Sequence, residues 1–202
     1  MSIQKAKWIN MILAVCISIC LFIFKNNIAA SFSLLLYILV TLYLYYPLLS
    51  QLSEFRDARP MNHIIRNVAI ALLLLAGSIV AFFLVIKNGI AVLSSPVSNF
   101  LMAMILALIM VAFGLAAPKL PYHQKVGLKV PWTTNDEATW FVAHHIWGNI
   151  SLPIGILCIA GFSLSFRVEI WLLCLLFTWL IIPCVLSYIY LIKRWKKEAS
   201  ST

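Results

Sequence analysis

Charged side chains are scarce in this sequence. Only 10% of the 202 residues are Asp, Glu, Lys or Arg, and 63% are hydrophobic, whereas a soluble domain of ordinary composition is about one quarter charged. None of the 15 basic and 6 acidic residues lies within the long apolar runs. A charge at the centre of a bilayer costs about 2.5 kcal/mol or more on insertion scales. The distribution therefore excludes an ordinary soluble fold and indicates an integral membrane protein.

Recognisable metal and thiol motifs are also missing. The five cysteines lie in apolar runs without Cys-x-x-Cys spacing, so we interpret them as packing residues. His123, His144, His145 and Glu137 lie near one another, but no His-x-x-x-His pair occurs among the four histidines. Adjacent histidines on a helix point about 100° apart. We therefore expect no metal and no other cofactor, and no internal repeat indicates an inverted-repeat transporter.

Six apolar runs are long enough to cross a bilayer as helices. A hydrocarbon core about 30 Å thick requires roughly 17 to 25 apolar residues per helix. The qualifying runs are 8–24, 28–49, 67–86, 97–117, 140–164 and 170–192. They are too long for the strands of a membrane barrel. The predicted fold is therefore all-α, a six-transmembrane-helix bundle that forms one integral membrane domain over residues 1–202.

Basic residues are divided unequally between the two ends of this predicted bundle. Twelve of the 15 flank one end, and only Lys25, Lys87 and Arg167 flank the other. By the positive-inside rule, both termini and the segments 50–66 and 118–139 are predicted to be cytoplasmic. The net charge of +9 is then explained by a basic rim facing membrane lipids, and no direct nucleic-acid binding is expected.

The segment 118–139 is long for a connection inside a compact bundle, and such loops are usually functional or disordered. Because it is rich in proline and large aromatics, we expect an ordered loop at the cytoplasmic interface. Pro131 favours an extended residue before it and should present Trp132 to the headgroups. Thr134 and Glu137 have the spacing of a capping box and predict the start of the fifth helix.

One face of this fifth helix is predicted to carry polar and aromatic side chains. Steps of three and four residues connect Glu137, Trp140, His144, Trp147 or Gly148, and Ser151. Two interpretations remain open: an inward face with a hydrogen-bonded histidine, or a binding or ionisable site at the cytoplasmic mouth of the helix. His145 points away from this face and is expected at the interface.

The stretch "GLKVPWTTNDEATWFVAHHIWG" resembles the SdpI family of bacterial membrane immunity proteins, and the likeness covers about residues 100–162. The matched positions are Gly127, Pro131, Trp132, Thr133, Glu137, Trp140, His144 and Gly148. Lys129 stands where the family usually has Arg, which removes the bidentate geometry of a guanidinium. We take these eight residues and Lys129 as the candidate binding residues.

The resemblance implies a multi-pass cell-membrane protein that is not an enzyme. It would protect against a secreted membrane-active peptide toxin, or bacteriocin. The family's founding member is also associated with holding a transcriptional repressor at the membrane, so the implied partners are a peptide toxin, such a cytoplasmic repressor and membrane lipids.

Two alternatives stay open from the residues themselves. A membrane enzyme acting on lipid or peptide would use Glu137 and His144 for proton transfer, although no nucleophile or metal set accompanies them. A small transporter would need ionisable groups in the membrane interior, and only His144 and His145 approach that depth.

Overall fold

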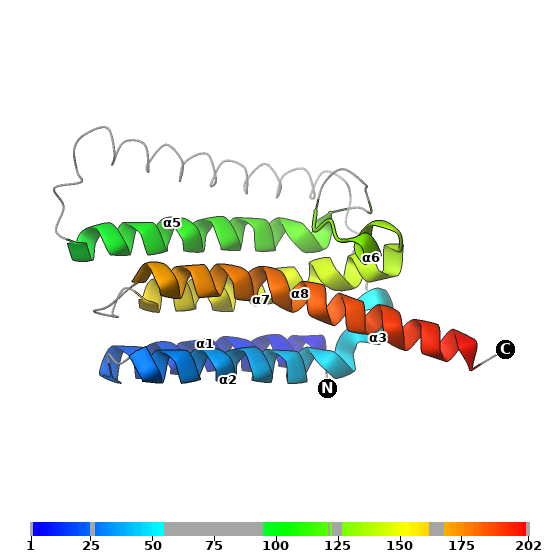
Figure 1. Ribbon diagram of the computed structural model, residues 1–202, viewed down its shortest axis with the longest axis horizontal. Coiled ribbons are helices and arrows are strands. Elements are labelled where there is room, and N and C mark those ends of the chain that lie inside the picture. The colour runs from blue at the N-terminus through cyan, green and yellow to red at the C-terminus, as the bar shows by residue number, and fades with distance from the viewer. Residues whose placement is uncertain are drawn as a thin grey trace.

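The computed structural model describes residues 2–24, 27–54, 95–120, 122, 127–161 and 168–200, and these residues contain helices and no strand (Figure 1). The α-helices are α1 (Ile3–Phe24), α2 (Asn27–Tyr45), α3 (Leu49–Glu54), α5 (Ser95–Ala116), α6 (Pro131–Thr134), α7 (Glu137–Ala160) and α8 (Val168–Ala199). Two 3-10 turns, η1 (Tyr46–Leu48) and η3 (Ala117–Lys119), follow α2 and α5. The all-α prediction is confirmed for this part of the chain.

Among the residues that the structure describes, five helical stretches are long and apolar enough to cross a membrane. They correspond to the predicted runs 8–24, 28–49, 97–117, 140–164 and 170–192, and the run 67–86 lies outside the described residues. The helix α8 continues past the predicted end at 192 to Ala199. Its 32 residues correspond to a length of about 48 Å at 1.5 Å per residue. Because the hydrocarbon core is only about 30 Å thick, the last turns of α8 extend beyond it.

The helix α7 lies at the centre of the described bundle. It packs against α5, α8 and α1, and Figure 1 shows α5 on one side of α7 and α8, with α1 and α2 on the other. In the most apolar part of α7, 78% of the residues are buried, compared with 28% in α1. A helix that is apolar all round is typical of such a central position. The candidate residues Trp140 and His144 on α7 are therefore surrounded by protein.

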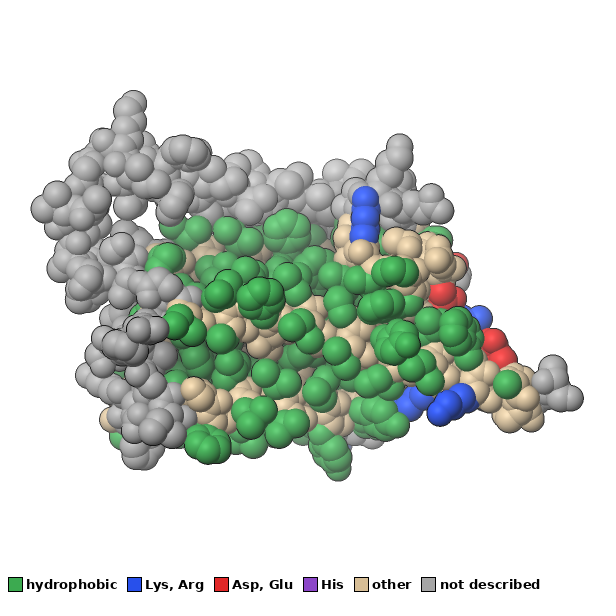
Figure 2. All heavy atoms as spheres, in the orientation of Figure 1, with side chains coloured by type: hydrophobic (Ala, Val, Ile, Leu, Met, Phe, Trp, Pro, Cys, Tyr) green, Lys and Arg blue, Asp and Glu red, His purple; other side chains and the backbone are tan. Residues whose placement is uncertain are grey.

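The outer surface of the bundle is apolar along most of its length. Figure 2 shows hydrophobic side chains across the described part of one face, with the charged side chains of that view gathered toward the end where α8 finishes. Large exposed hydrophobic residues occur on α1, α2, α5 and α8. A surface of this kind suits contact with lipid tails, where charged groups are costly.

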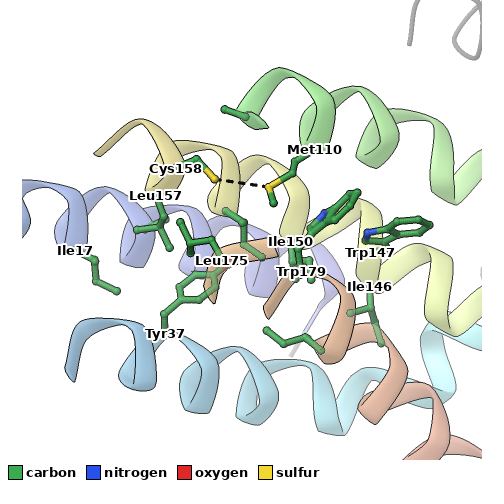
Figure 3. Packing of buried hydrophobic residues seen from close by; sticks show 14 of the residues in the cluster. Ile17, Tyr37, Met110, Ile146, Trp147, Ile150, Leu157, Cys158, Leu175 and Trp179 are labelled. Carbon is green, nitrogen blue, oxygen red and sulfur yellow. Dashed lines mark hydrogen bonds between the residues drawn. The ribbon is translucent and has the colours of Figure 1, made fainter. Parts of the chain in front are cut away.

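Small residues allow α5 and α7 to approach each other closely. A methyl group added at Gly114 of α5 would overlap the Ser151 side chain of α7, and one added at Gly148 of α7 would overlap Pro118. Further along the pair, the Cys158 thiol contacts the Met110 sulfur at 3.7 Å (Figure 3). Close contact through small residues is a common way to join helices in membranes. The family-like residue Gly148 therefore contributes to helix packing.

Candidate functional site

The candidate site lies where the chain turns from the segment at 127–130 through α6 into α7. Gly127 has a φ of +122°, a backbone conformation that other L-residues rarely adopt. A side chain at this position would also overlap the Trp140 ring and His144 Nε2. Glycine is thus required for two independent reasons, and it brings the backbone directly onto α7.

His144 joins this backbone to α7. Its Nε2 accepts a hydrogen bond from the Leu128 N–H at 3.1 Å, and its Nδ1 lies 2.9 Å from the Trp140 carbonyl oxygen. A carbonyl can only accept, so Nδ1 carries the proton and the imidazole is neutral in this arrangement. The ring is 1% exposed and stacks on Trp140 at a centroid distance of 3.9 Å. The Nε2 bond therefore holds the turn on α7, and the Nδ1 bond fixes the imidazole against its own helix.

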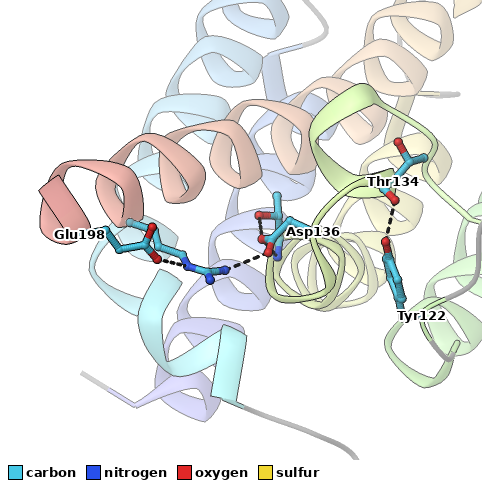
Figure 4. Close-up of polar contacts among 6 residues, drawn as sticks. Tyr122, Thr134, Asp136 and Glu198 are labelled. Atoms are coloured by element: carbon cyan, nitrogen blue, oxygen red, sulfur yellow. Dashed lines mark hydrogen bonds and ion pairs between the residues drawn. The ribbon is translucent and has the colours of Figure 1, made fainter.

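Trp140 forms the inner wall of the turn and is fully buried. The Tyr122 ring meets it edge-on at 5.8 Å, and the Tyr122 hydroxyl donates to the Thr134 carbonyl at 2.6 Å (Figure 4). Aromatic pairs with this geometry contribute about 0.5–1.5 kcal/mol beyond their buried area. Tyr122 thus ties the end of α6 to the start of α7.

The Thr133 side chain bonds the backbone just before the short helix α6 and so holds the start of this helix. Its hydroxyl donates to the Leu128 carbonyl at 2.6 Å and accepts from the Val130 N–H at 3.2 Å, and the residue is fully buried. Val130 has the extended conformation expected before Pro131, with φ of −117° and ψ of 154°. Lys129 is exposed beside them. These hydrogen bonds give residues 128–133 a defined conformation, whereas residues 121 and 123–126 of the predicted loop lie outside the described residues.

Trp132 packs against α8, which the sequence did not predict. Its indole N–H donates to the Ser187 hydroxyl at 3.0 Å, and its ring lies 5.1 Å from the Tyr188 ring. We expected an indole directed at the headgroups, but its hydrogen-bond donor is already used within the protein. Trp132 consequently connects α6 to the helix 55 residues further along the chain.

The predicted capping box of Thr134 and Glu137 is wrong. Thr134 belongs to the end of α6, and α7 is capped by Asp136, whose carboxylate accepts from the Thr139 N–H at 2.8 Å and also from the Thr139 hydroxyl. The backbone is extended at Asp136, with φ of −140° and ψ of 116°, so the first helical residue is Glu137. The break between α6 and α7 therefore moves the cap two residues later than predicted.

Asp136 has a second partner at the far end of the chain. Its other carboxylate oxygen accepts from Arg194 Nη1 at 2.8 Å, and Arg194 Nε donates to Glu198 at 2.9 Å (Figure 4). The Arg194 side chain is 42% exposed. Sequence reasoning missed this ion pair, because its partners are 58 residues apart.

The predicted inward face of α7 is largely confirmed. Trp140, His144, Trp147 and Ser151 are buried, whereas Glu137 is exposed at the helix start. His145, which was expected at the interface, is only 7% exposed, because its imidazole lies against its own helix with Nδ1 at 2.9 Å from a carbonyl oxygen one turn earlier.

Ser151 extends this face into a buried hydrogen-bond chain. Its hydroxyl donates to the Trp147 carbonyl at 2.6 Å and accepts from the Trp179 indole N–H of α8 at 2.7 Å. The Trp147 and Trp179 ring centroids lie 4.8 Å apart. Figure 3 shows the two side chains among the buried residues of the bundle. The α7 face therefore packs through aromatic rings and the hydrogen bonds of Ser151, while the buried indole nitrogens of Trp140 and Trp147 have no hydrogen-bond partner within the described part of the chain.

The geometry offers little for acid–base chemistry. Glu137 and His144 are seven residues apart, which corresponds to about 10.5 Å along a helix. His144 is buried and uses both ring nitrogens in hydrogen bonds to backbone groups, one in the turn and one in α7. Within the described ranges, no group of three or more His, Cys, Asp and Glu residues could hold a metal ion. The candidate residues thus form a structural turn with a few exposed members.

The exposed members are the residues that a partner could reach. Lys129, Pro131 and Glu137 are exposed, and Trp132 and Gly127 are half-buried. The other candidates are Thr133, Trp140 and His144, which are buried, and Gly148, which is half-buried against η3. The nine residues therefore divide into a supporting group and an exposed group.

Comparison with known proteins agrees with the resemblance in the sequence. A model of the SdpI/YfhL protein family matches residues 119–190. The match begins later than the predicted likeness at 100–162 and continues through most of α8, so it includes Ser187 and Trp179 as well as the turn. No curated protein and no solved structure shows significant similarity to the chain. Residues 119–190, which include the turn, α7 and most of α8, are thus the part of the chain that is similar to the SdpI/YfhL family.

Proposed function

We propose that this protein is a membrane immunity protein that protects a bacterial cell from a secreted, membrane-active peptide toxin without chemical turnover. The observation that carries the proposal is the family match over residues 119–190, the part of the chain that forms the turn and the central helices. The buried, fully bonded His144 supports a binding role over a catalytic one.

The proposal includes a topology with six membrane spans and both termini in the cytoplasm. Twelve basic residues at one end of the bundle, against three at the other, support this orientation. The turn at 127–137 and the end of α8 then lie at the inner leaflet. The short outer connections leave little protein outside, so a toxin would meet the lipid-facing sides of the helices.

We assign separate roles to the two groups of candidate residues. Gly127, Thr133, Trp140 and His144 hold the turn on α7, so substitutions there act through folding. Lys129 has an exposed side chain at the surface of the turn, so substitutions there act through a partner. This division predicts that variants of the supporting residues lower the abundance of the protein in the membrane, whereas variants of Lys129 keep that abundance and lose protection.

Survival of cells exposed to a panel of secreted peptide toxins tests the proposed function. Cells expressing the protein should survive toxin concentrations that kill cells with an empty vector, and deletion from the native host should increase sensitivity. Unchanged sensitivity to every toxin in both strains would contradict the proposal. Membrane abundance of the protein is measured in each strain, so that loss of protein is not mistaken for loss of function.

A Glu137→Gln variant separates immunity from the enzymatic alternative. The substitution keeps size and hydrogen bonding but cannot transfer a proton, and Glu137 is exposed at the helix start. Full protection at normal abundance is expected. Complete loss of protection at normal abundance would favour proton transfer by this carboxylate.

Capture of a cytoplasmic transcriptional repressor is a second proposed role. The exposed positions Lys129 and Glu137, which flank α6 on the same turn, support it. A photo-crosslinking residue in place of Lys129 should trap a small DNA-binding protein when toxin is present. Crosslinks to lipid alone, with and without toxin, would contradict this role.

A further inference from the structure

A groove lies beside the turn, between α6 and the last turns of α8. Its volume is about 450 Å³. The residues that give it its chemistry are three aromatic side chains, one cation and two carboxylates, namely Trp132, Tyr188, Trp195, Arg194, Asp136 and Glu198. Neither toxin protection nor repressor capture, as proposed above, requires this groove.

The groove spans the level at which α8 leaves the apolar layer. Tyr188 precedes the end of the apolar run at 192, and Trp195 and Glu198 follow it. Trp195 is 61% exposed and Tyr188 is 48% exposed. Tryptophan and tyrosine favour the boundary between lipid tails and headgroups, because their rings are apolar and their edges are polar. An occupant of the groove would therefore contact both regions of a lipid.

The charge within the groove opposes the charge of the whole chain. Arg194 bonds Asp136 and Glu198 at 2.8 and 2.9 Å, so one cation faces two carboxylates, although the protein as a whole carries +9. The neighbouring Lys193 points elsewhere, with its ammonium 3.3 Å from the centre of the Tyr46 ring. A net negative groove disfavours a purely anionic headgroup and favours a group that carries a positive charge.

Aromatic walls and carboxylates together are suited to an ammonium group. Cations are attracted to the faces of tryptophan and tyrosine rings, most strongly where water is partly excluded. Carboxylates add hydrogen bonds if the ammonium has N–H donors, which a quaternary ammonium lacks. The guanidinium of Arg194 lies between the carboxylates and could meet a phosphate a few bonds away from the ammonium.

We propose that this groove binds the headgroup of a zwitterionic phospholipid with a primary amine, such as phosphatidylethanolamine. The ammonium contacts Trp132, Trp195 and the two carboxylates, and the phosphate contacts Arg194. The acyl chains continue along α8 past Tyr188. This site involves neither the toxin nor the repressor, so the lipid proposal can be tested separately from the proposed function.

Native mass spectrometry of the purified full-length protein tests the proposal. The protein in detergent is titrated with phosphatidylethanolamine, phosphatidylcholine and phosphatidylglycerol that share the same acyl chains. One phosphatidylethanolamine molecule should bind about tenfold more tightly than either other lipid, because only its headgroup matches both the rings and the carboxylates. Equal affinities for the three lipids would overturn the proposal.

Two variants and a matched control locate the bound lipid. Trp195→Ala and Glu198→Gln change exposed side chains of the groove, and each should reduce the preference for phosphatidylethanolamine by about tenfold. Trp8→Ala is the control, because Trp8 is 59% exposed on α1 and lies outside the groove. It should leave the preference unchanged. An equal loss in all three variants, or none in the two groove variants, would contradict the assignment.

A lysine-rich peptide provides the competing outcome. If the groove were a protein-docking site, this peptide would bind the parent protein and would bind the Glu198→Gln variant more weakly. The lipid affinities of the two proteins would then be the same. That pattern would overturn the lipid assignment in favour of a basic protein partner. The expected result is the reverse, with lipid affinity reduced and peptide binding unaffected.

Discussion

Replacing Gly127 with alanine places a side chain where the chain turns onto α7. Two costs follow from the structure. A φ of +122° is strained for any residue with a Cβ, and such conformations cost about 1–3 kcal/mol. The methyl group would also overlap Trp140 and His144 Nε2, so the loop must move away from α7.

Moving the loop breaks the hydrogen bond from the Leu128 N–H to His144. That bond is 3.1 Å long and His144 is 1% exposed, so the imidazole nitrogen would be left buried without this donor. An unsatisfied buried polar group costs about 1–3 kcal/mol. With the backbone strain, the expected loss in the free energy of unfolding for Gly127→Ala is about 2–6 kcal/mol.

The assay is reversible unfolding of purified protein in mixed micelles, followed by tryptophan fluorescence. Gly155→Ala is the matched control, since a Cβ at this α7 glycine would lie 3.0 Å from the Val111 side chain and needs only a small adjustment. Alanine also favours a helix over glycine by about 1 kcal/mol, so we expect little change for the control. A loss below about 1 kcal/mol for Gly127→Ala would refute the reasoning, because strain and overlap together cannot be that small.

Three further substitutions separate contacts that have similar hydrogen-bond lengths but different burial. Ser151→Ala should lower the free energy of unfolding by about 1–3 kcal/mol, because the buried Trp179 indole N–H would lose its acceptor; an unchanged value in the same unfolding assay would show that the indole finds another partner. Asp136→Ala should cost about 1–2 kcal/mol through loss of the α7 cap. Arg194→Ala should lower the free energy of unfolding by less than about 1 kcal/mol, since its ion pair is partly exposed. The free energy of unfolding of both variants is measured at low and high salt, and equal losses for Asp136→Ala and Arg194→Ala would contradict the capping role of Asp136.

The inward face of α7 could be predicted because helical periodicity determines which side chains share a face. Residues at steps of three and four lie together on a helix, so the spacing of Trp140, His144, Trp147 and Ser151 is enough to place them on one side. Periodicity does not state where the face begins. Glu137 fits the same spacing, yet it lies at the first turn of α7 and is exposed.

The cap of α7 could not be chosen from local sequence alone. Thr134 and Asp136 are both good N-cap residues, and their intrinsic preferences differ by only a few tenths of a kcal/mol. The choice depends on where α6 ends, and α6 ends at Thr134 because Thr133 and Tyr122 hold it against the turn. A tertiary contact therefore decided between two equivalent local signals.

Contacts between segments that are far apart in the sequence could not be predicted. Trp132 with Ser187 and Asp136 with Arg194 are separated by 55 and 58 residues. An aromatic residue beside proline fits an interfacial position as well as a packed one. The sequence around Trp132 therefore did not favour a contact with α8. The family match, which runs from 119 to 190, includes both Trp132 and Ser187.

The proposed topology places the turn at 127–137, which is held on α7, at the cytoplasmic face of the membrane. Asn135 is exposed between α6 and α7, so a cysteine introduced there in a variant without the five native cysteines reports the sidedness of the turn. In intact cells, a membrane-impermeant maleimide should leave Asn135→Cys unlabelled, and the same reagent should label it after lysis. Labelling in intact cells would place the turn outside and contradict the account.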